Sequence, residues 1–292
     1  MIKYWLFELL RFVVRILHPR LIYAIGAFLA EVTYLFPRES KRNLRANLIH
    51  ILSYRGEDVS TRDVRKKIRI LIRKNFRNFS YYLVDFFRFS QLSRKDIKDI
   101  VELTGTANID HALSGGRGAL GVTAHLGNWE LGGMLLSRLG YPVNAIALSH
   151  QNTRLNRLFV NQRALSGMKV VPVGKAVLKS LRALKKNELV LILGDRDVTE
   201  RGIEVTFFGA PAHIPRGPAG LAVRSGADIF FGYFIRESTH RFKAVFRPPL
   251  RIDRSAPWEN RERQIITGLV KEMEECIVEN LTQWYMYYRI WP

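Results

Sequence analysis

The chain has few acidic residues and almost no cysteine. Its 292 residues include 46 Lys and Arg against 26 Asp and Glu, a formal net charge of +20. So large a cationic excess favours an anionic partner, which can be nucleic acid, an anionic bilayer surface or a phosphorylated ligand. The single cysteine, Cys276, excludes an intrachain disulfide and is typical of a protein in a reducing compartment. We expect its thiol to be buried as a small apolar group.

Several motifs that define large enzyme classes are missing as well. The sequence contains no Gly-x-Ser-x-Gly, which argues against an α/β-hydrolase. It has neither a P-loop nor a dinucleotide-binding fingerprint. The histidines outside residues 120–130 neither pair at helical ligand spacing nor stand beside cysteine, so we expect no metal site.

The chain also lacks an uninterrupted apolar run long enough for one helix to cross a bilayer perpendicular to its plane. Residues 1–36 are apolar and aromatic, but Glu8, Arg11 and Arg15 interrupt the first half, which also argues against a secretory signal. On a helical wheel the polar residues of that half fall within about 140°, as in a helix that lies in a membrane interface. After Pro19, residues 21–36 give a helix of roughly 24 Å, against roughly 30 Å of hydrocarbon core. We therefore assign residues 1–37 to membrane-association helices. Two helices that only cover the protein's own core fit the composition equally well, and a single tilted span is a further alternative.

The charge is concentrated in one segment. Residues 38–98 contain 17 Lys and Arg against 6 Asp and Glu, and they are predicted to be mostly helical. Ser60 or Thr61 is a suitable N-cap for a helix through Phe89, whose aromatic side chains recur at steps of three and four. That spacing is typical of a core face, and the segment shows no nucleic-acid-binding motif, so we do not expect nucleic acid as the partner.

Beyond residue 100, short apolar runs of β type alternate with helical stretches. This alternation predicts an α/β fold with a mixed, mostly parallel central sheet and helices on both faces. We assign residues 38–292 to this domain, the basic helical segment included. The expected strands are 119–124, 143–148, 169–173, 189–193, 229–235 and 242–246. The expected helices are 129–139, 154–166, 176–186, 217–225 and 258–282.

One hexapeptide, HLGNWE at 125–130, follows the first of these strands. A histidine at the end of a strand stands at the sheet edge where α/β proteins place their ligands. Gly127 permits a sharp turn, and Asn128 can cap the next helix. Glu130 could then fold back to orient the imidazole, which is a suitable base for a hydroxyl that attacks a thioester. His125 and Glu130 are therefore candidate catalytic residues.

Several ordered motifs resemble one family over nearly the whole chain. HLGNWE is similar to the His-x4-Asp/Glu motif of the lysophospholipid acyltransferase superfamily, and in detail to its lipid A biosynthesis branch. RNLRANL at 42–48, GDRD at 194–197, the block at 202–229 and QWYMYYRIWP at 283–292 are similar to further parts of that branch. The resemblance implies a glycerolipid-acyltransferase-like arrangement of the sheet and helices.

The resemblance also implies a reaction, which is the transfer of a fatty acyl group from acyl carrier protein or coenzyme A to a hydroxyl of a membrane lipid. No cofactor is expected beyond that thioester. His125 is then the base, with Glu130 as its partner; Glu204 matches a glutamate that serves the histidine in mycobacterial mannolipid acyltransferases. The acceptor can be a lipid A precursor, a lysophospholipid or a phosphatidylinositol mannoside. The implied location is the cytoplasmic face of the inner membrane, against an anionic leaflet.

Charged residues of the second block give further candidates and an alternative. Asp195, Arg196 and Asp197 follow the apolar run LVLIL, again at a sheet edge. Arg196 can bind a phosphate between the aspartates, or Asp195 and Asp197 can hold a metal, as in a metal-dependent glycosyltransferase; a structural ion-pair network is equally compatible. Arg216 and Gly217 open a helix whose free N–H groups could bind a phosphate. Arg163 resembles an arginine that the family places near its site.

Overall fold

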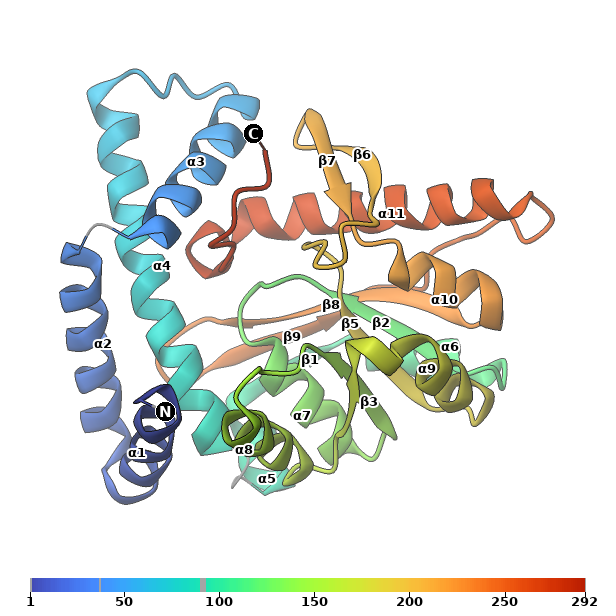
Figure 1. The fold of residues 1–292 in the computed structure, drawn as a ribbon, viewed down its shortest axis with the longest axis horizontal. Helices are drawn as coiled ribbons and strands as arrows, with labels where there is room; N and C mark the ends of the chain where they lie inside the picture. The colour runs from blue at the N-terminus through green and yellow to red at the C-terminus, as the bar shows by residue number, and fades with distance from the viewer. Residues whose placement is uncertain (1, 37, 90–92, 292) are drawn as a thin grey trace.

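A seven-stranded sheet lies at the centre of the protein (Figure 1). The computed structural model describes residues 2–36, 38–89 and 93–291. The strand order is β1-β9-β8-β2-β5-β3-β4, and each neighbouring pair is parallel except β8 and β9. The predicted α/β fold with a mixed, mostly parallel sheet is confirmed. The strands are β1 (Val101–Thr104), β2 (Ala119–Thr123), β3 (Val143–Ala147), β4 (Lys169–Pro172), β5 (Leu189–Leu193), β8 (Asp228–Arg236) and β9 (Phe242–Phe246), and β6 (Ile203–Phe207) and β7 (Ala210–Ile214) form a separate hairpin.

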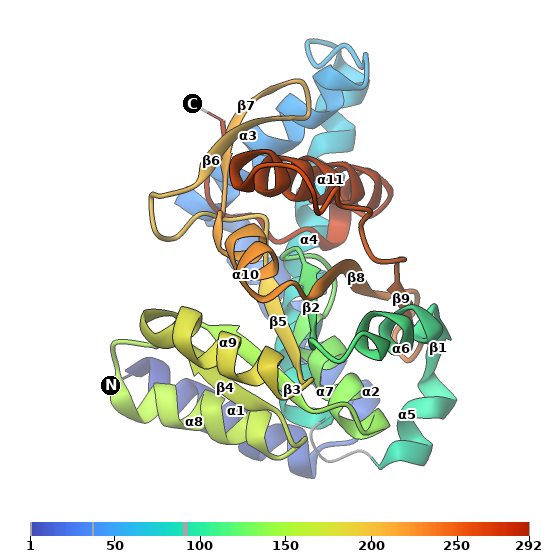
Figure 2. The same ribbon diagram turned by 90° about the vertical axis from the view of Figure 1, so that its right-hand side faces the viewer.

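Helices flank this sheet on both faces (Figures 1 and 2). The first four are α1 (Ile2–Ile16), α2 (Pro19–Leu35), α3 (Glu39–Tyr54) and α4 (Arg62–Arg88). The others are α5 (Arg94–Ile100), α6 (Thr106–Ser114), α7 (Trp129–Leu139), α8 (Thr153–Ala164), α9 (Ala176–Lys185), α10 (Gly217–Ser225) and α11 (Trp258–Glu279). Thr61 is the N-cap of α4, as the sequence predicts, because its hydroxyl accepts a hydrogen bond from the N–H of Val64.

The sheet separates two apolar cores. Along β8, Ile229 and Phe231 belong to one core, whereas Phe230 and Phe234 belong to the other. Successive side chains of a strand point to opposite faces, so an uninterrupted apolar strand can fill both cores at once. The first core also takes in α3, α9, α10 and α11, and the second takes in α7 and the carboxyl half of α4.

Helices α1 and α2 pack beside α4 at one side of the molecule (Figure 1). Within the described ranges, no single helix is both long and apolar enough to cross a bilayer. Helices α2 and α3 satisfy that test only together, and they are bent by 86° relative to each other. The expected boundary at residue 37 lies outside the described residues, and the membrane association of residues 1–37 stays a prediction.

The segment after α11 returns across the sheet edge and packs into the protein. Trp284 is fully buried, and the carbonyl oxygens of Leu281 and Trp284 accept hydrogen bonds from the Asn75 side chain on α4. Asn47 on α3 donates in the same way to the carbonyl groups of Met286 and Tyr288. These contacts bring the aromatic segment next to the carboxyl end of β2.

Candidate active site

The turn that carries His125 leaves the carboxyl end of β2 and enters α7. Gly127 has φ +62°, and a Cβ atom there would lie 2.0 Å from the carbonyl oxygen of Phe234, so only glycine fits. Asn128 caps α7, since its side-chain oxygen accepts the N–H of Leu131 at 3.0 Å. Backbone hydrogen bonds from Gly127 to Gln283 and from Asn128 to Phe234 fix the turn on both sides. The sequence predicted this strand, turn and cap, and the structure confirms them.

His125 pairs with Asp195. The ring Nδ1 lies 2.7 Å from one carboxylate oxygen of Asp195, and the backbone N–H of His125 donates to the other oxygen at 2.8 Å. The indole N–H of Trp284 donates to that second oxygen at 3.1 Å. Strand register explains the pairing, because Thr123 on β2 stands opposite Leu193 on β5, and each functional residue comes two positions later.

The Asp195 carboxylate is stabilised as an anion. Asp195 is 2% exposed, and burial alone would raise the pKa of its carboxyl group. The His125 imidazole and the hydrogen bonds from His125 and Trp284 outweigh that effect, so the pKa of Asp195 is lowered. A carboxylate that accepts from Nδ1–H leaves the Nε2 nitrogen free to take a proton. His125 thus has the arrangement of a general base with an orienting carboxylate.

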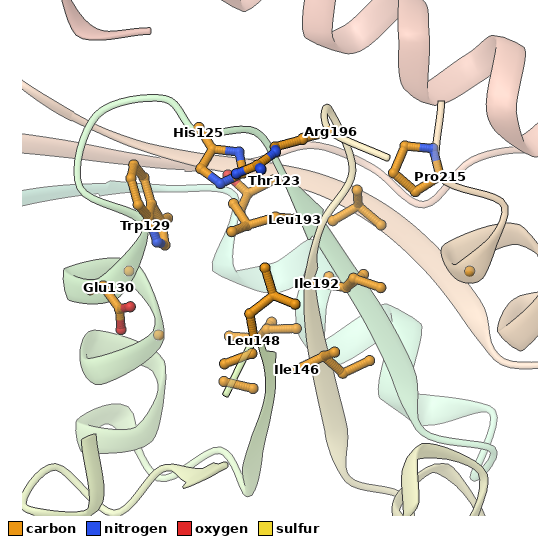
Figure 3. Close-up of a pocket in the computed structure, with 18 of the residues that line it drawn as sticks. Thr123, His125, Trp129, Glu130, Ile146, Leu148, Ile192, Leu193, Arg196 and Pro215 are labelled. Carbon is orange, nitrogen blue, oxygen red and sulfur yellow. The ribbon is translucent and has the colours of Figure 1, made fainter. Parts of the chain in front are cut away.

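Glu130 was expected to contact the His125 imidazole, but it does not. It forms a bidentate ion pair with Arg163 on α8, with Nε–Oε2 and Nη2–Oε1 distances of 2.9 and 2.5 Å. The ion pair is largely buried, and the attraction of Glu130 raises the pKa of Arg163 against the effect of burial. Figure 3 shows Glu130 on α7 with its carboxylate directed away from His125. Glu130 and Arg163 both line the cavity below the histidine.

Glu204 is not the partner of His125 either. It lies exposed on β6, in register with His213 of β7, and it does not line the cavity. The β6–β7 hairpin stands apart from the main sheet, which carries His125 and Asp195 on adjacent strands. The two glutamates that the sequence offered as partners are therefore replaced by an aspartate that the sequence assigned to phosphate binding.

The other charged residues of the second block divide in two. Arg196 lines the cavity beside His125 (Figure 3), and its guanidinium carbon lies 3.1 Å from the centre of the Tyr288 ring. Asp197 holds its own loop by accepting hydrogen bonds from the backbone N–H groups of Thr199 and Gly202. The Asp195 and Asp197 carboxylates are thus engaged separately. In the described part of the chain, no three His, Cys, Asp or Glu side chains gather to hold a metal ion.

Arg216 and Gly217 lie at the start of α10. The Arg216 guanidinium pairs with Glu262 of α11 at 2.6 Å, and Arg216 does not line the cavity. Gly217 does line it, together with Pro215. The expected phosphate-binding role of Arg216 is weakened by that ion pair, whereas the amino end of α10 remains open to the cavity.

The cavity below His125 is mainly apolar and has a volume of about 510 Å³. It extends from the carboxyl ends of β2, β3 and β5 into the space between α7 and the sheet (Figure 3). Gly132 and Gly133 on α7 face this space, which leaves it open where larger side chains would fill it. Its apolar lining includes Leu136, Met168, Phe230 and Phe246. A pocket of this size and character suits an acyl chain.

Sequence reasoning missed three residues that complete the site. Trp284 braces Asp195, and Tyr285 donates its backbone N–H to the carbonyl of His125. His150 lines the cavity, and burial together with the Arg163 cation lowers its pKa, which favours the neutral ring. The sequence pointed to the first two only through the aromatic segment at 283–292, which carries part of the family resemblance but assigned no role to either residue.

A buried carboxylate behind a histidine, at the mouth of an apolar cavity on an α/β sheet, is an arrangement suited to the transfer of an apolar acyl group. Comparison with known proteins agrees, because residues 1–292 match the bacterial lipid A biosynthesis acyltransferase family. The chain belongs to this family and is an acyltransferase.

Curated relatives include two phosphatidylinositol mannoside acyltransferases. That of Mycolicibacterium smegmatis is 28% identical over 211 residues, which are 71% of this chain and 67% of the relative. That of Mycobacterium tuberculosis is 29% identical over 158 residues, 52% of this chain and 50% of the relative. The matches thus span about half to two thirds of the length of these relatives.

Proposed function

We propose that this acyltransferase moves a fatty acyl group from a thioester donor to a hydroxyl of an anionic membrane glycolipid, with His125 as general base. The observation that supports this most directly is the His125–Asp195 pair at the mouth of the apolar cavity. Nδ1 is engaged by the carboxylate, so Nε2 is the nitrogen available to the acceptor.

The reaction follows from that arrangement. Nε2 of His125 removes the proton of the acceptor hydroxyl as its oxygen attacks the thioester carbonyl carbon, and the carbon–oxygen bond forms. The tetrahedral intermediate then breaks its carbon–sulfur bond. The leaving thiolate takes the proton from the imidazolium, which restores the neutral ring. Asp195 orients the ring and stabilises its charged form between the two steps.

Two arginines serve different purposes in this proposal. Arg196 lies beside His125 and has no carboxylate partner among the described residues, so its charge is available for a phosphate of donor or acceptor. Arg163 is neutralised by Glu130, and this pair fixes α8 against α7 along the cavity wall. The acyl chain occupies the space between α7 and the sheet.

The acceptor class rests on charge and on the comparisons. The family is described by lipid A biosynthesis, and the curated relatives by phosphatidylinositol mannosides. Both acceptors are anionic glycolipids, which suits the net charge of +20. Either acyl carrier protein or coenzyme A can supply the thioester, since both donors are anionic.

An apolar surface on α1 and α2 supports a place at the membrane. One side of α1 packs on the protein through Val14, whereas Trp5, Phe12 and Ile16 are each about 60% exposed. The surface of a soluble protein rarely exposes so many large apolar side chains to water. We propose that this face lies in the cytoplasm-facing leaflet of the inner membrane, where donor and acceptor meet. The further exposed apolar residues of these two helices are Ile2, Leu6, Leu9, Leu21, Ile25, Phe28, Leu29 and Leu35.

The reaction is tested with purified protein in detergent and a chelator. Acyl carrier protein and coenzyme A thioesters are supplied separately with a lipid A precursor, a phosphatidylinositol mannoside or a lysophospholipid. Acylated glycolipid from the wild type and none from His125→Ala is the expected result. Full activity in a folded His125→Ala protein contradicts the mechanism, and acylation of the lysophospholipid alone contradicts the acceptor class.

The membrane surface has a separate test. Phe12→Glu should weaken binding to vesicles that contain anionic phospholipid by roughly 10- to 100-fold, because one buried aromatic side chain contributes about 1.5–3 kcal/mol. Ile70→Glu is the matched control, since Ile70 is an exposed apolar residue of α4. Cosedimentation measures both variants. Equal weakening by the two substitutions contradicts a specific role for α1.

A further inference from the structure

Behind the His125 turn, a second carboxylate is buried without contact with the cavity. Asp85 on α4 is 1% exposed and forms an ion pair with Arg236 of β8. One of its oxygens also accepts the hydroxyl of Tyr23 on α2 at 2.6 Å, and the other accepts the side-chain N–H of Asn128 at 3.1 Å. One carboxylate thus joins two helices, a strand and the catalytic turn.

The cation of this pair is held as firmly as the anion. The Arg236 guanidinium lies over the Phe242 ring at 4.5 Å and over the Tyr23 and Tyr81 rings at 5.3 Å. Its terminal nitrogen also donates to the carbonyl oxygen of Thr239 at 2.7 Å. A buried ion pair adds little stability compared with apolar residues of the same volume, because both charges lose their hydration. Its presence here therefore calls for a role other than stability.

Asn128 connects Asp85 to the reacting histidine. Its oxygen caps α7, its side-chain N–H donates to Asp85, and it lies three residues after His125. Asp85 therefore sets the side-chain orientation in which Asn128 holds the turn. A catalytic base displaced by about 1 Å can lose on the order of 100-fold in rate.

A second connection runs from Arg236 to the other catalytic residue. The Gln283 side chain exchanges two hydrogen bonds with the Arg236 backbone, at 2.8 and 2.9 Å. The Gln283 carbonyl accepts the N–H of Gly127, and the next residue, Trp284, donates to Asp195. The Asp85–Arg236 pair thus stands behind both His125 and Asp195.

We propose that Asp85 is a positioning residue for acyl transfer, which acts through Asn128 to hold the His125 turn against Asp195. This inference rests on the proposed function. In this proposal, a buried ion pair outside the cavity contributes to the rate of acyl transfer. That contribution also depends on α2, because Tyr23 on α2 donates a hydrogen bond to Asp85.

The test is Asn128→Ser, which keeps a good helix cap and removes the side-chain amide that donates to Asp85. A base displaced by a fraction of an ångström to about 1 Å loses rate without losing substrate binding, so kcat should fall at least about tenfold while KM for the thioester stays unchanged. Asn152→Ser makes the same change at the N-cap of α8, where the side chain accepts from Leu155, and should keep wild-type kcat.

A double-mutant cycle separates positioning from general stability. If Asn128 acts through Asp85, adding Asn128→Ser to Asp85→Asn lowers kcat little further. Should Asp85→Asn not fold, Tyr23→Phe replaces it, because it removes another bond to the same carboxylate. Wild-type kcat in Asn128→Ser, an equal fall in Asn152→Ser, or fully additive losses overturns the proposal. An inactive wild type contradicts the proposed function instead.

Discussion

Replacing Asp195 by asparagine tests the catalytic pair most directly. The carboxylate accepts three hydrogen bonds, from the ring and backbone of His125 and from Trp284. An amide has one accepting oxygen, so at least one of these donors must face an NH₂ group. If that donor is Nδ1, the ring turns to the tautomer with its proton on Nε2, which cannot act as a base.

The size of the effect follows from the role of the base. General base catalysis contributes about 10²–10⁴-fold, and loss of the carboxylate behind a histidine costs on the order of 10⁴-fold in a serine protease. We expect kcat of Asp195→Asn to fall by about 10²–10⁴-fold with little change in KM. Single-turnover transfer from a labelled thioester measures the chemical step.

Glu204→Gln is the matched control, because it neutralises an exposed carboxylate outside the cavity. It should keep wild-type kcat and melting temperature. Activity near the wild-type level in Asp195→Asn, or its loss in Glu204→Gln, would refute the assignment of Asp195 as the partner of His125.

Asp195→Asn should also change how the free energy of unfolding depends on pH. The pKa of Asp195 is lowered in the folded protein, so its ionised form stabilises the fold above the unfolded value of about 3.9. That contribution is lost as the pH falls through the lowered folded pKa. The difference in unfolding free energy between wild type and Asp195→Asn should therefore be largest near neutral pH and shrink below about pH 4. A constant difference in urea titrations would contradict this reasoning.

Three further predictions concern the residues around the site. Glu130→Gln leaves the Arg163 cation buried without its partner, so urea unfolding should show a loss of about 3–5 kcal/mol, and a smaller loss when Arg163→Met is added. Gly133→Ala places a Cβ atom 2.7 Å from the Met168 sulfur, which must move into the cavity; competition between donors should then favour shorter acyl chains, and an unchanged preference would place the acyl chain elsewhere. Burial raises the pKa of the Cys276 thiol to about 12, so iodoacetamide at pH 8 should label the unfolded chain and spare the native protein.

The main sheet could be predicted because its strands are apolar on both faces. The run LVLIL at 189–193 and the strand at 229–235 read as buried strands without help from their neighbours. Strand β1 was not predicted, since a run of only four residues is too short for its alternation to stand out. The β6–β7 hairpin was missed because each strand has only five residues and Pro211 argues against a strand.

The position of the candidate base His125 could be predicted from the sequence, but the carboxylate that contacts it could not. HLGNWE lies within one strand–turn–helix unit, so its local geometry follows from Gly127 and Asn128. The partner depends on which strand lies beside β2, and the chain reaches β5 only after β3 and β4. The spacing along the sequence favoured Glu130 as the partner. Glu130 lies on α7, five residues after His125, and from there its carboxylate contacts Arg163 instead. Such pairings depend on strand order, which a single sequence does not reveal.

The contact between Trp284 and Asp195 also bears on when the enzyme becomes active during its synthesis. The two residues are 89 positions apart, which corresponds to about 4 to 18 seconds of translation at roughly 5–20 residues per second. Until residues 283–285 emerge from the ribosome, the His125 turn lacks two of its backbone partners and Asp195 lacks one donor. A nascent chain can therefore form its sheet while its chemistry is still incomplete. The His125–Asp195 pair is therefore fully supported only after residues 283–285 have joined the fold.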